Sequence, residues 1–186
     1  MAFFKLVLAF SPWLAFLFIA QGSMFRLKLG LVLSLALSLL MGLAKLHRGV
    51  ILWVGLLFFS AAGVAVIGFE SAWAARYMGM TANLALAGAV WFGLAIGRPF
   101  TLDYSKDHAP TEKEFHADFI RSNYKVALVW AIVFTINACL ALAKTLDVLP
   151  RLAGEIVSYT LLLAVATFTA WYPGYARAKR QRAAVG

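Results

Sequence analysis

The feature that most constrains this chain is a series of six apolar runs that contain no charged residue. They lie at 6–20, 29–44, 50–69, 78–96, 126–143 and 156–172. A helix needs about 20 apolar residues, with a range of about 17–25, to cross the hydrocarbon core of a bilayer. The last four runs reach that length. The sequence therefore predicts an all-α, multi-pass membrane protein: one domain, residues 1–186, built as a compact bundle of about six transmembrane helices.

The composition excludes a water-soluble fold. Of the 186 residues, 63% are apolar and 13% are charged, whereas soluble domains have about 45–50% and about 25%. A chain of this length buries only about 70% of its unfolded surface, which is too little to cover so many apolar side chains. Soluble enzymes and free nucleic-acid-binding domains are excluded. Cys139 is the single cysteine, and we expect it to be a small buried side chain.

The first two runs are short, and the first allows two interpretations. Flanking residues such as Phe25 and Leu27 would lengthen the second run. The first run follows Lys5, as in a signal peptide, but Phe18 stands where cleavage after Ala20 would need a small residue. We expect a retained helix that either spans the membrane or forms an interfacial or re-entrant segment.

The basic residues predict the orientation of the chain. With six spans, 12 of the 17 Lys and Arg residues fall on the side of the two termini. Cytoplasmic loops carry such an excess. We therefore expect both termini, the long loop 97–125 and the basic tail 173–186 to be cytoplasmic.

Small residues recur at every fourth position in four of the runs, which places them on one helical face. They are Gly30, Ser34, Ser38 and Gly42; Ala85, Ala89, Gly93 and Gly97; Ala127, Ala131, Thr135, Cys139 and Ala143; and Ala166, Ala170 and Gly174. Small faces let membrane helices approach closely. The stripes predict a compact bundle, and the same spacing would also suit a homodimer.

The loop 97–125 is the longest polar stretch. Arg98 and Pro99 are expected to end the fourth helix, and a capping box that begins at Thr111 predicts a short amphipathic helix at the membrane interface. Its candidate partner- or headgroup-binding residues are Arg98, Phe100, Tyr104, Lys106 and Arg121. His108, Glu112 and His116 are spaced four apart, but Pro110 interrupts them, so we expect no metal site.

Inside the spans, ionisable residues are almost absent, and the polar residues Asn83, Asn137 and Tyr159 are candidates for a polar path. No familiar catalytic or phosphate-binding motif occurs. We therefore expect no catalytic residue, no cofactor and no nucleic-acid partner.

Several short motifs follow the order found in a known family. They are Ser11-Pro12, the basic turn Lys45–Arg48, Arg98-Pro99, the stretch Val129-Trp130-Ala131-Ile132-Val133-Phe134 with Asn137, and the turn at Pro150. In these the chain resembles the intracellular septation protein A (YciB) family of bacterial inner-membrane proteins. Its loop is longer and more polar and resembles a PFT-x-x-Tyr loop of uncharacterised bacterial membrane proteins. The resemblance implies an inner-membrane location, a role in cell-envelope maintenance or division, and no catalytic residues.

Three functions remain open, and a cavity would distinguish them. The first is a non-enzymatic scaffold whose cytoplasmic loop binds anionic lipid headgroups or other membrane or division proteins, with tight packing inside. The second is a small-molecule transporter or channel, with a polar cavity that reaches both sides. The third is a membrane enzyme acting on a lipid or quinone, with a lateral opening beside the loop.

Overall fold

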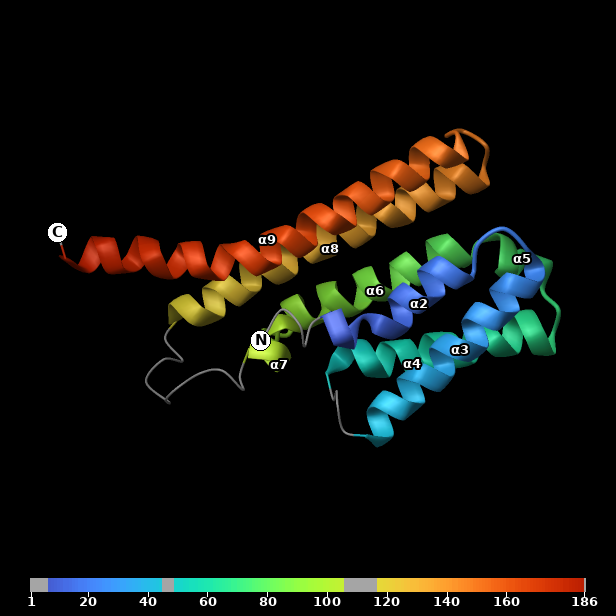
Figure 1. The fold of residues 1–186 in the computed structure, drawn as a ribbon, viewed down its shortest axis with the longest axis horizontal. Coiled ribbons are helices and arrows are strands. Elements are labelled where there is room, and N and C mark those ends of the chain that lie inside the picture. The colour runs from blue at the N-terminus through green and yellow to red at the C-terminus, as the bar shows by residue number, and fades with distance from the viewer. Residues whose placement is uncertain (1–6, 45–48, 106–116, 186) are drawn as a thin grey trace.

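The computed structural model describes residues 7–44, 49–105 and 117–185, and every regular element in those ranges is a helix (Figure 1). In chain order the helices are α2 (Ser11–Ile19), α3 (Met24–Leu43), α4 (Val50–Gly63), the π-helical turn η1 (Val64–Gly68), α5 (Ala72–Arg76), α6 (Met78–Ala95), α7 (Thr101–Ser105), α8 (Ala117–Thr145) and α9 (Arg151–Val185). The expected all-α fold is confirmed.

Five helical segments in the described ranges are long and apolar enough to cross a membrane: α3, α4 with η1, α6, α8 and α9. The second run gains its length at its start, because α3 begins at Met24 and so includes Phe25 and Leu27. Ser23 caps this helix, and its side chain accepts a hydrogen bond from the backbone N–H of Arg26 at 3.2 Å. The fold is that of a multi-pass membrane protein.

The first run forms the short helix α2, which has nine residues and lies beside α3. Pro12 stands in its first turn, where its missing N–H costs no hydrogen bond. Gly22, with φ of +89°, turns the chain back into α3. A Cβ on Gly30 would lie 2.9 Å from the Cβ of Ala20, so this glycine allows α3 to touch the end of α2.

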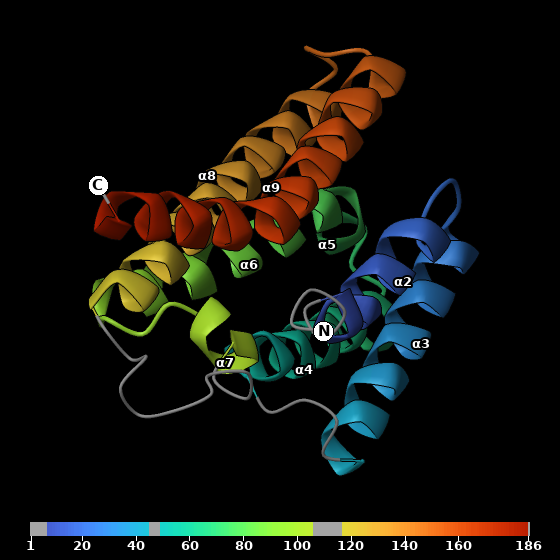
Figure 2. The same ribbon diagram turned by 60° about the vertical axis from the view of Figure 1, so that its left-hand side comes forward.

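The connections alternate between the two ends of the molecule. The α2–α3, α4–α6 and α8–α9 connections lie at one end, whereas α7, the start of α8 and the end of α9 lie at the other (Figures 1 and 2). Two residues after the end of α6, Gly97 has φ of +75°, and the N–H of Arg98 bonds to the carbonyl of Gly93 at 2.8 Å. This is a glycine C-cap, and Pro99 follows it.

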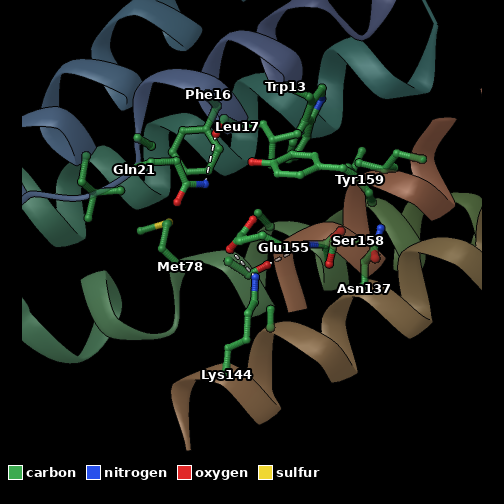
Figure 3. Close-up of a pocket in the computed structure, with 18 of the residues that line it drawn as sticks. Trp13, Phe16, Leu17, Gln21, Met78, Asn137, Lys144, Glu155, Ser158 and Tyr159 are labelled. Atoms are coloured by element: carbon green, nitrogen blue, oxygen red, sulfur yellow. Dashed lines mark hydrogen bonds and ion pairs between the residues drawn. The ribbon is translucent and has the colours of Figure 1, made fainter. Parts of the chain in front are cut away.

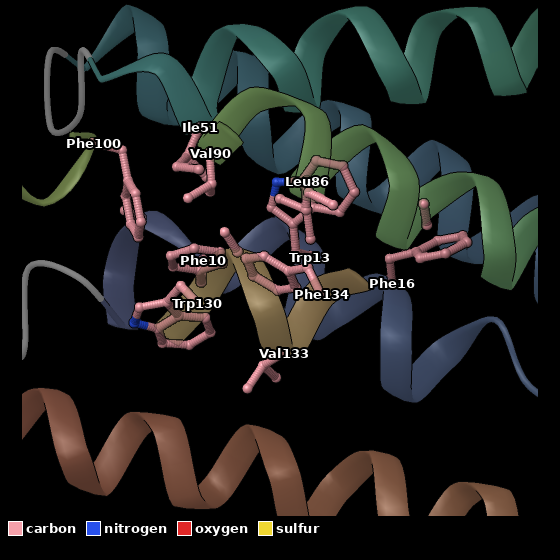
Figure 4. Close-up of a cluster of buried hydrophobic side chains, with 14 of the residues drawn as sticks. Phe10, Trp13, Phe16, Ile51, Leu86, Val90, Phe100, Trp130, Val133 and Phe134 are labelled. Carbon is pink, nitrogen blue, oxygen red and sulfur yellow. The ribbon is translucent and has the colours of Figure 1, made fainter. Parts of the chain in front are cut away.

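Aromatic side chains of α2 and the turn before it fill the centre of the bundle (Figure 4). Phe10 stacks on Trp130 of α8, with ring centroids 5.2 Å apart. Trp13 and Phe16 lie 4.9 and 5.6 Å from the ring of Phe59 in α4. The short first helix therefore contributes one side to the core, while Leu14 and Phe18 on its other side are exposed.

The last helix lies at the edge of the bundle and packs chiefly along α8. In its most apolar stretch 11% of the residues are buried, against 50% in α8. It continues past the predicted span into the basic tail, through Pro173. A proline inside a helix removes one backbone hydrogen bond and bends the helix, and α9 changes direction along its length (Figure 2).

The predicted small-residue stripes have different surroundings. Gly30, Ser34 and Ser38 are buried along α3, as expected. In α9, by contrast, Ala170 and Gly174 are exposed, because none of the described helices covers this side of α9. The expectation that Cys139 is buried is wrong, since its side chain lies on an exposed face of α8.

The close approach at Gly30 leads to a first prediction. We expect Gly30→Ala to destabilise the protein by about 1–3 kcal/mol, because the added methyl group must push α2 away from α3. The measurement is the midpoint of thermal unfolding in detergent. Gly88→Ala is the control, since a Cβ there meets nothing within 4 Å and alanine favours a helix over glycine. Equal losses in both variants would contradict the role given to Gly30.

The charge distribution and the alternating helix ends give a prediction of topology. In a Cys139→Ala background, we expect an impermeant thiol reagent added to intact cells to label Val148→Cys, in the exposed α8–α9 connection, and to leave Asp103→Cys in α7 unlabelled. Labelling of Asp103→Cys alone would reverse the orientation, and labelling of both sites would contradict a single orientation.

Candidate functional site: a cavity between α2 and α9

A cavity of about 790 Å³ lies between α2 on one side and α9 on the other, with α6 and α8 between them (Figure 3). Its apolar lining comes from all of these helices and from α3, and includes Phe10, Trp13, Leu14, Phe16, Leu17, Leu27, Met78, Ala82, Leu86, Trp130, Phe134, Leu162 and Ala166. The volume lies within the range of about 300–1,000 Å³ typical of small-molecule sites.

The polarity of the cavity changes from one end to the other. Gln21, Asp147 and Arg151 line it and are exposed, at the end that carries the α2–α3 and α8–α9 connections. At the opposite end the lining residues Phe10 and Trp130 are buried and stacked on each other. The end beside these connections, called the opening, is therefore charged, and the inner end is apolar. The lining residues Val7 and Leu14 are also exposed, at 39% and 36%, so the space is open along its side as well.

One face of α8 runs the length of the cavity. Its lining residues are Trp130, Phe134, Asn137, Ala141 and Lys144. They are spaced three or four apart, so they lie above one another on the helix. From the inner end outward, this face presents two aromatic rings, a carboxamide, a methyl group and an ammonium group.

An ion pair joins α8 to α9 near the opening. Lys144 Nζ lies 2.6 Å from Oε1 of Glu155, and the two side chains are 17% and 31% exposed. Gly154 makes the contact possible, because a Cβ at that position would lie 2.5 Å from Cδ of Lys144. The aliphatic part of the lysine thus passes over the glycine to reach the carboxylate.

The end of α8 places further charges at the opening. Arg76 donates a hydrogen bond to the backbone carbonyl of Thr145 at 3.2 Å, where a cation is favoured by the helix dipole. Asp147, with φ of 56°, adopts the left-handed conformation that ends α8. Among the described residues, the charged ones in the lining are Arg76, Lys144, Asp147, Arg151 and Glu155, and together they carry one net positive charge.

The three residues proposed for a polar path, Asn83, Asn137 and Tyr159, all line this cavity. Asn83 Nδ2 donates to the carbonyl of Gly79 in its own helix at 2.8 Å. The ring of Tyr159 stacks on Phe18 of α2, with centroids 6.3 Å apart and planes 3° from parallel. Asn137 is 2% exposed, and its Oδ1 has no hydrogen-bond partner in the structure.

The candidate binding residues of the loop 97–125 that the structure describes lie at the end of the molecule opposite the cavity opening. Arg98 and Arg121 are exposed, whereas Phe100 and Tyr104 are buried in the bundle. Burial, with a smaller effect of the neighbouring Asp103 carboxylate, raises the pKa of the Tyr104 phenol, so this side chain stays neutral. The other loop residues named in the sequence analysis lie outside the described residues: Lys106, His108, Thr111 with its capping box, Glu112 and His116.

The helix α7 in this loop is tied to α8 by two hydrogen bonds. Thr101 Oγ1 donates to the carbonyl of Asn123 at 3.0 Å, and Ser105 Oγ donates to Asn123 Oδ1 at 3.2 Å.

In the ranges that the structure describes, no group of three or more His, Cys, Asp or Glu side chains is placed to hold a metal ion.

The Lys144–Glu155 pair was not predicted from the sequence. Both residues lie near helix ends, where charged side chains usually anchor a helix to the interface. One feature of the sequence could have indicated this ion pair: Lys144 and Glu155 flank a short turn, and Gly154 stands directly before Glu155.

Comparisons with known proteins add no family to this description. No protein-family model, no curated protein and no solved structure matches the chain. The resemblance to the septation protein family remains a hypothesis drawn from short motifs.

The ion pair at the opening can be tested with a double-mutant cycle. We expect Lys144→Met and Glu155→Gln each to destabilise the protein, and the double variant to lose about 1 kcal/mol less than the sum of the two. The thermal midpoint in detergent measures each step. Lys28 and Glu70 form the control pair, at 3.6 Å with the acid 81% exposed, and we expect a coupling near zero there. Additive losses at Lys144 and Glu155 would contradict the pairing.

Proposed function

We propose that this protein binds an amphipathic small molecule in the cavity between α2 and α9. The observation that carries the proposal is the polarity of this space, which has an aromatic inner end and a charged opening. A molecule with an apolar body would contact Phe10, Trp13 and Phe134, and its polar head would lie beside Lys144 and Glu155. The net positive charge of the opening favours an anionic or zwitterionic head.

The position of the opening bears on the three functions considered from the sequence. A scaffold predicts tight packing, and a cavity of about 790 Å³ is better explained by a ligand. An enzyme acting beside the loop predicts an opening next to α7, whereas this one lies at the far end. A pore predicts a polar passage that reaches both sides, whereas the inner end of this cavity is lined by apolar side chains such as Phe10 and Trp130. The geometry best supports a receptor or carrier that holds the polar head of its ligand at this charged end.

The expected orientation gives this binding a direction. With both termini in the cytoplasm of a bacterium and the chain in the inner membrane, the opening faces away from the cytoplasm. The exposed Arg98 and Arg121 at the opposite end remain candidates for contact with anionic headgroups or with a partner protein. On this proposal the protein binds its ligand without chemical change.

Tryptophan fluorescence provides the test of binding. Trp13 and Trp130 line the cavity and are each 6% exposed. The other four tryptophans are exposed, and we would replace them by phenylalanine: Trp53, Trp73, Trp91 and Trp171. Because the two remaining rings are shielded from the surrounding detergent, we expect dibromostearate to quench them saturably, and stearate to reverse the quenching.

A pair of alanines gives a matched control for this experiment. Ala166 lines the cavity, whereas Ala170, one turn further along α9, is exposed and does not. We expect Ala166→Phe to weaken dibromostearate binding about tenfold, or about 1.4 kcal/mol, because the ring occupies the space of the ligand. Ala170→Phe should bind as the parent does. Quenching that never saturates, or that responds equally to both variants, would refute the proposal.

A further inference from the structure

We infer that the ligand is an anionic phospholipid of the bilayer, which enters the cavity sideways between α2 and α9 and leaves its second acyl chain in the membrane. The inference rests on the proposed function and adds to it the chemical class of the ligand, its source and its route.

The cavity has a buried floor and exposed edges. The floor consists of buried residues of α6 and α8: Met78, Ala82, Leu86, Trp130, Phe134 and Ala141. Along the edge formed by α9 the lining residues are half-buried: Ser158, Tyr159, Leu162 and Ala166. At the α2 edge Val7 and Leu14 line the cavity and are exposed. The cavity is therefore a groove that opens to the side between α2 and α9.

This side opening faces lipid. The helix α9 is one of the segments that are long and apolar enough to cross a membrane, so an opening along its length adjoins the acyl chains of the bilayer. Phe18 of α2 stacks on Tyr159 of α9 across this opening, and Phe18 is exposed. The contact thus lies at the surface, where a lipid that moves within its leaflet would meet it.

The length of the groove matches one leaflet. Phe134 and Trp130 lie ten and fourteen residues before Lys144 on one face of α8, which corresponds to about 15 and about 21 Å along the helix axis. Half of the hydrocarbon core of a bilayer is about 15 Å thick. A lipid whose head lies beside Lys144 would therefore extend one acyl chain as far as these two rings.

The charges at the opening favour an anionic head. Lys144 and Glu155 neutralise each other in their ion pair. The remaining charged side chains among the described lining residues are Arg76, Asp147 and Arg151, with one net positive charge. Arg151 is exposed, and its side chain has no hydrogen bond or ion pair with another described residue. Its guanidinium can hold a phosphate through two hydrogen bonds.

The test of the lipid class uses the two-tryptophan variant described above, in phosphatidylcholine vesicles that contain increasing fractions of a brominated lipid. We compare phosphatidylglycerol, which is anionic, with phosphatidylcholine, which is zwitterionic, both with dibromostearoyl chains. We expect the brominated phosphatidylglycerol to quench Trp13 and Trp130 saturably and at an about fivefold lower fraction, a preference that one exposed ion pair allows.

Two matched variants locate the head of the lipid. Arg151→Gln should remove the preference for phosphatidylglycerol, because the head loses its cation. Lys125→Gln removes the same charge from an exposed position near the start of α8, at the other end of the molecule (Figure 1), and should retain the preference. Both side chains are exposed, so neither substitution should lower the thermal midpoint.

A reversible bridge tests the route of entry. In the same variant with Cys139→Ala, a short bifunctional thiol reagent joins Phe18→Cys to Tyr159→Cys in detergent, before lipid is added. Because a phospholipid of the bilayer must pass between these residues, we expect the bridge to abolish quenching by brominated phosphatidylglycerol and reduction to restore it. Dibromostearate has one chain that enters lengthwise from the charged end, and it should still quench the bridged protein.

The outcomes separate the inference from the proposed function. If both brominated phospholipids quench equally, if Arg151→Gln keeps the preference, or if the bridge leaves the quenching unchanged, the inference fails. It also fails if dibromostearate saturates the site and neither phospholipid quenches, and in all these cases the proposed function stands. If dibromostearate itself does not saturate, the proposed function fails and the inference with it.

Discussion

The structure depends on three aromatic side chains that the first apolar run places at the centre of the bundle. Lipid tails solvate apolar surface as well as a protein interior does, so helices in a bilayer associate through close packing and polar contacts and gain little from the hydrophobic effect. Phe10, Trp13 and Phe16 supply such packing, with rings in contact across α2, α4 and α8. A short helix serves this purpose because one side of it faces the longer helices, which leaves Trp13 and Phe16 buried, whereas Phe18 on its other side is 64% exposed.

The same helix explains why a cavity exists. One side of α2 packs into the core, and the other faces α9, which packs chiefly along α8. The stacked rings of Phe18 and Tyr159 bridge α2 and α9, and the Lys144–Glu155 pair holds α9 to the end of α8. The space between these contacts is bounded by α6 and α8. The cavity thus results from the difference between a tightly packed first helix and a loosely packed last one.

The sequence predicts the local features of this protein and leaves the tertiary ones open. Helix positions follow from the length and charge of each run, so α3, α6 and α8 lie where they were expected. Periodicity marks a small-residue face without showing whether a neighbouring helix covers it. For this reason Ala170 and Cys139 were expected to lie in helix contacts, whereas both are exposed. Asn83, Asn137 and Tyr159 stood out as polar residues in apolar runs, but their convergence depends on how α6, α8 and α9 meet. The Lys144–Glu155 pair depends on the path of a lysine over Gly154, which no spacing rule describes.

The peripheral position of α9 has a mechanical consequence. A force applied at the C-terminus would act first on a helix of which only 11% of the apolar stretch is buried, and the bend at Pro173 would straighten before any tertiary contact breaks. The helix would then peel from α8 toward the α8–α9 turn, and the ion pair beside that turn would be the last contact to yield. The remaining helices would keep their aromatic centre intact. Extraction of this protein from a membrane should therefore begin with one separable helix and continue with a cooperative core.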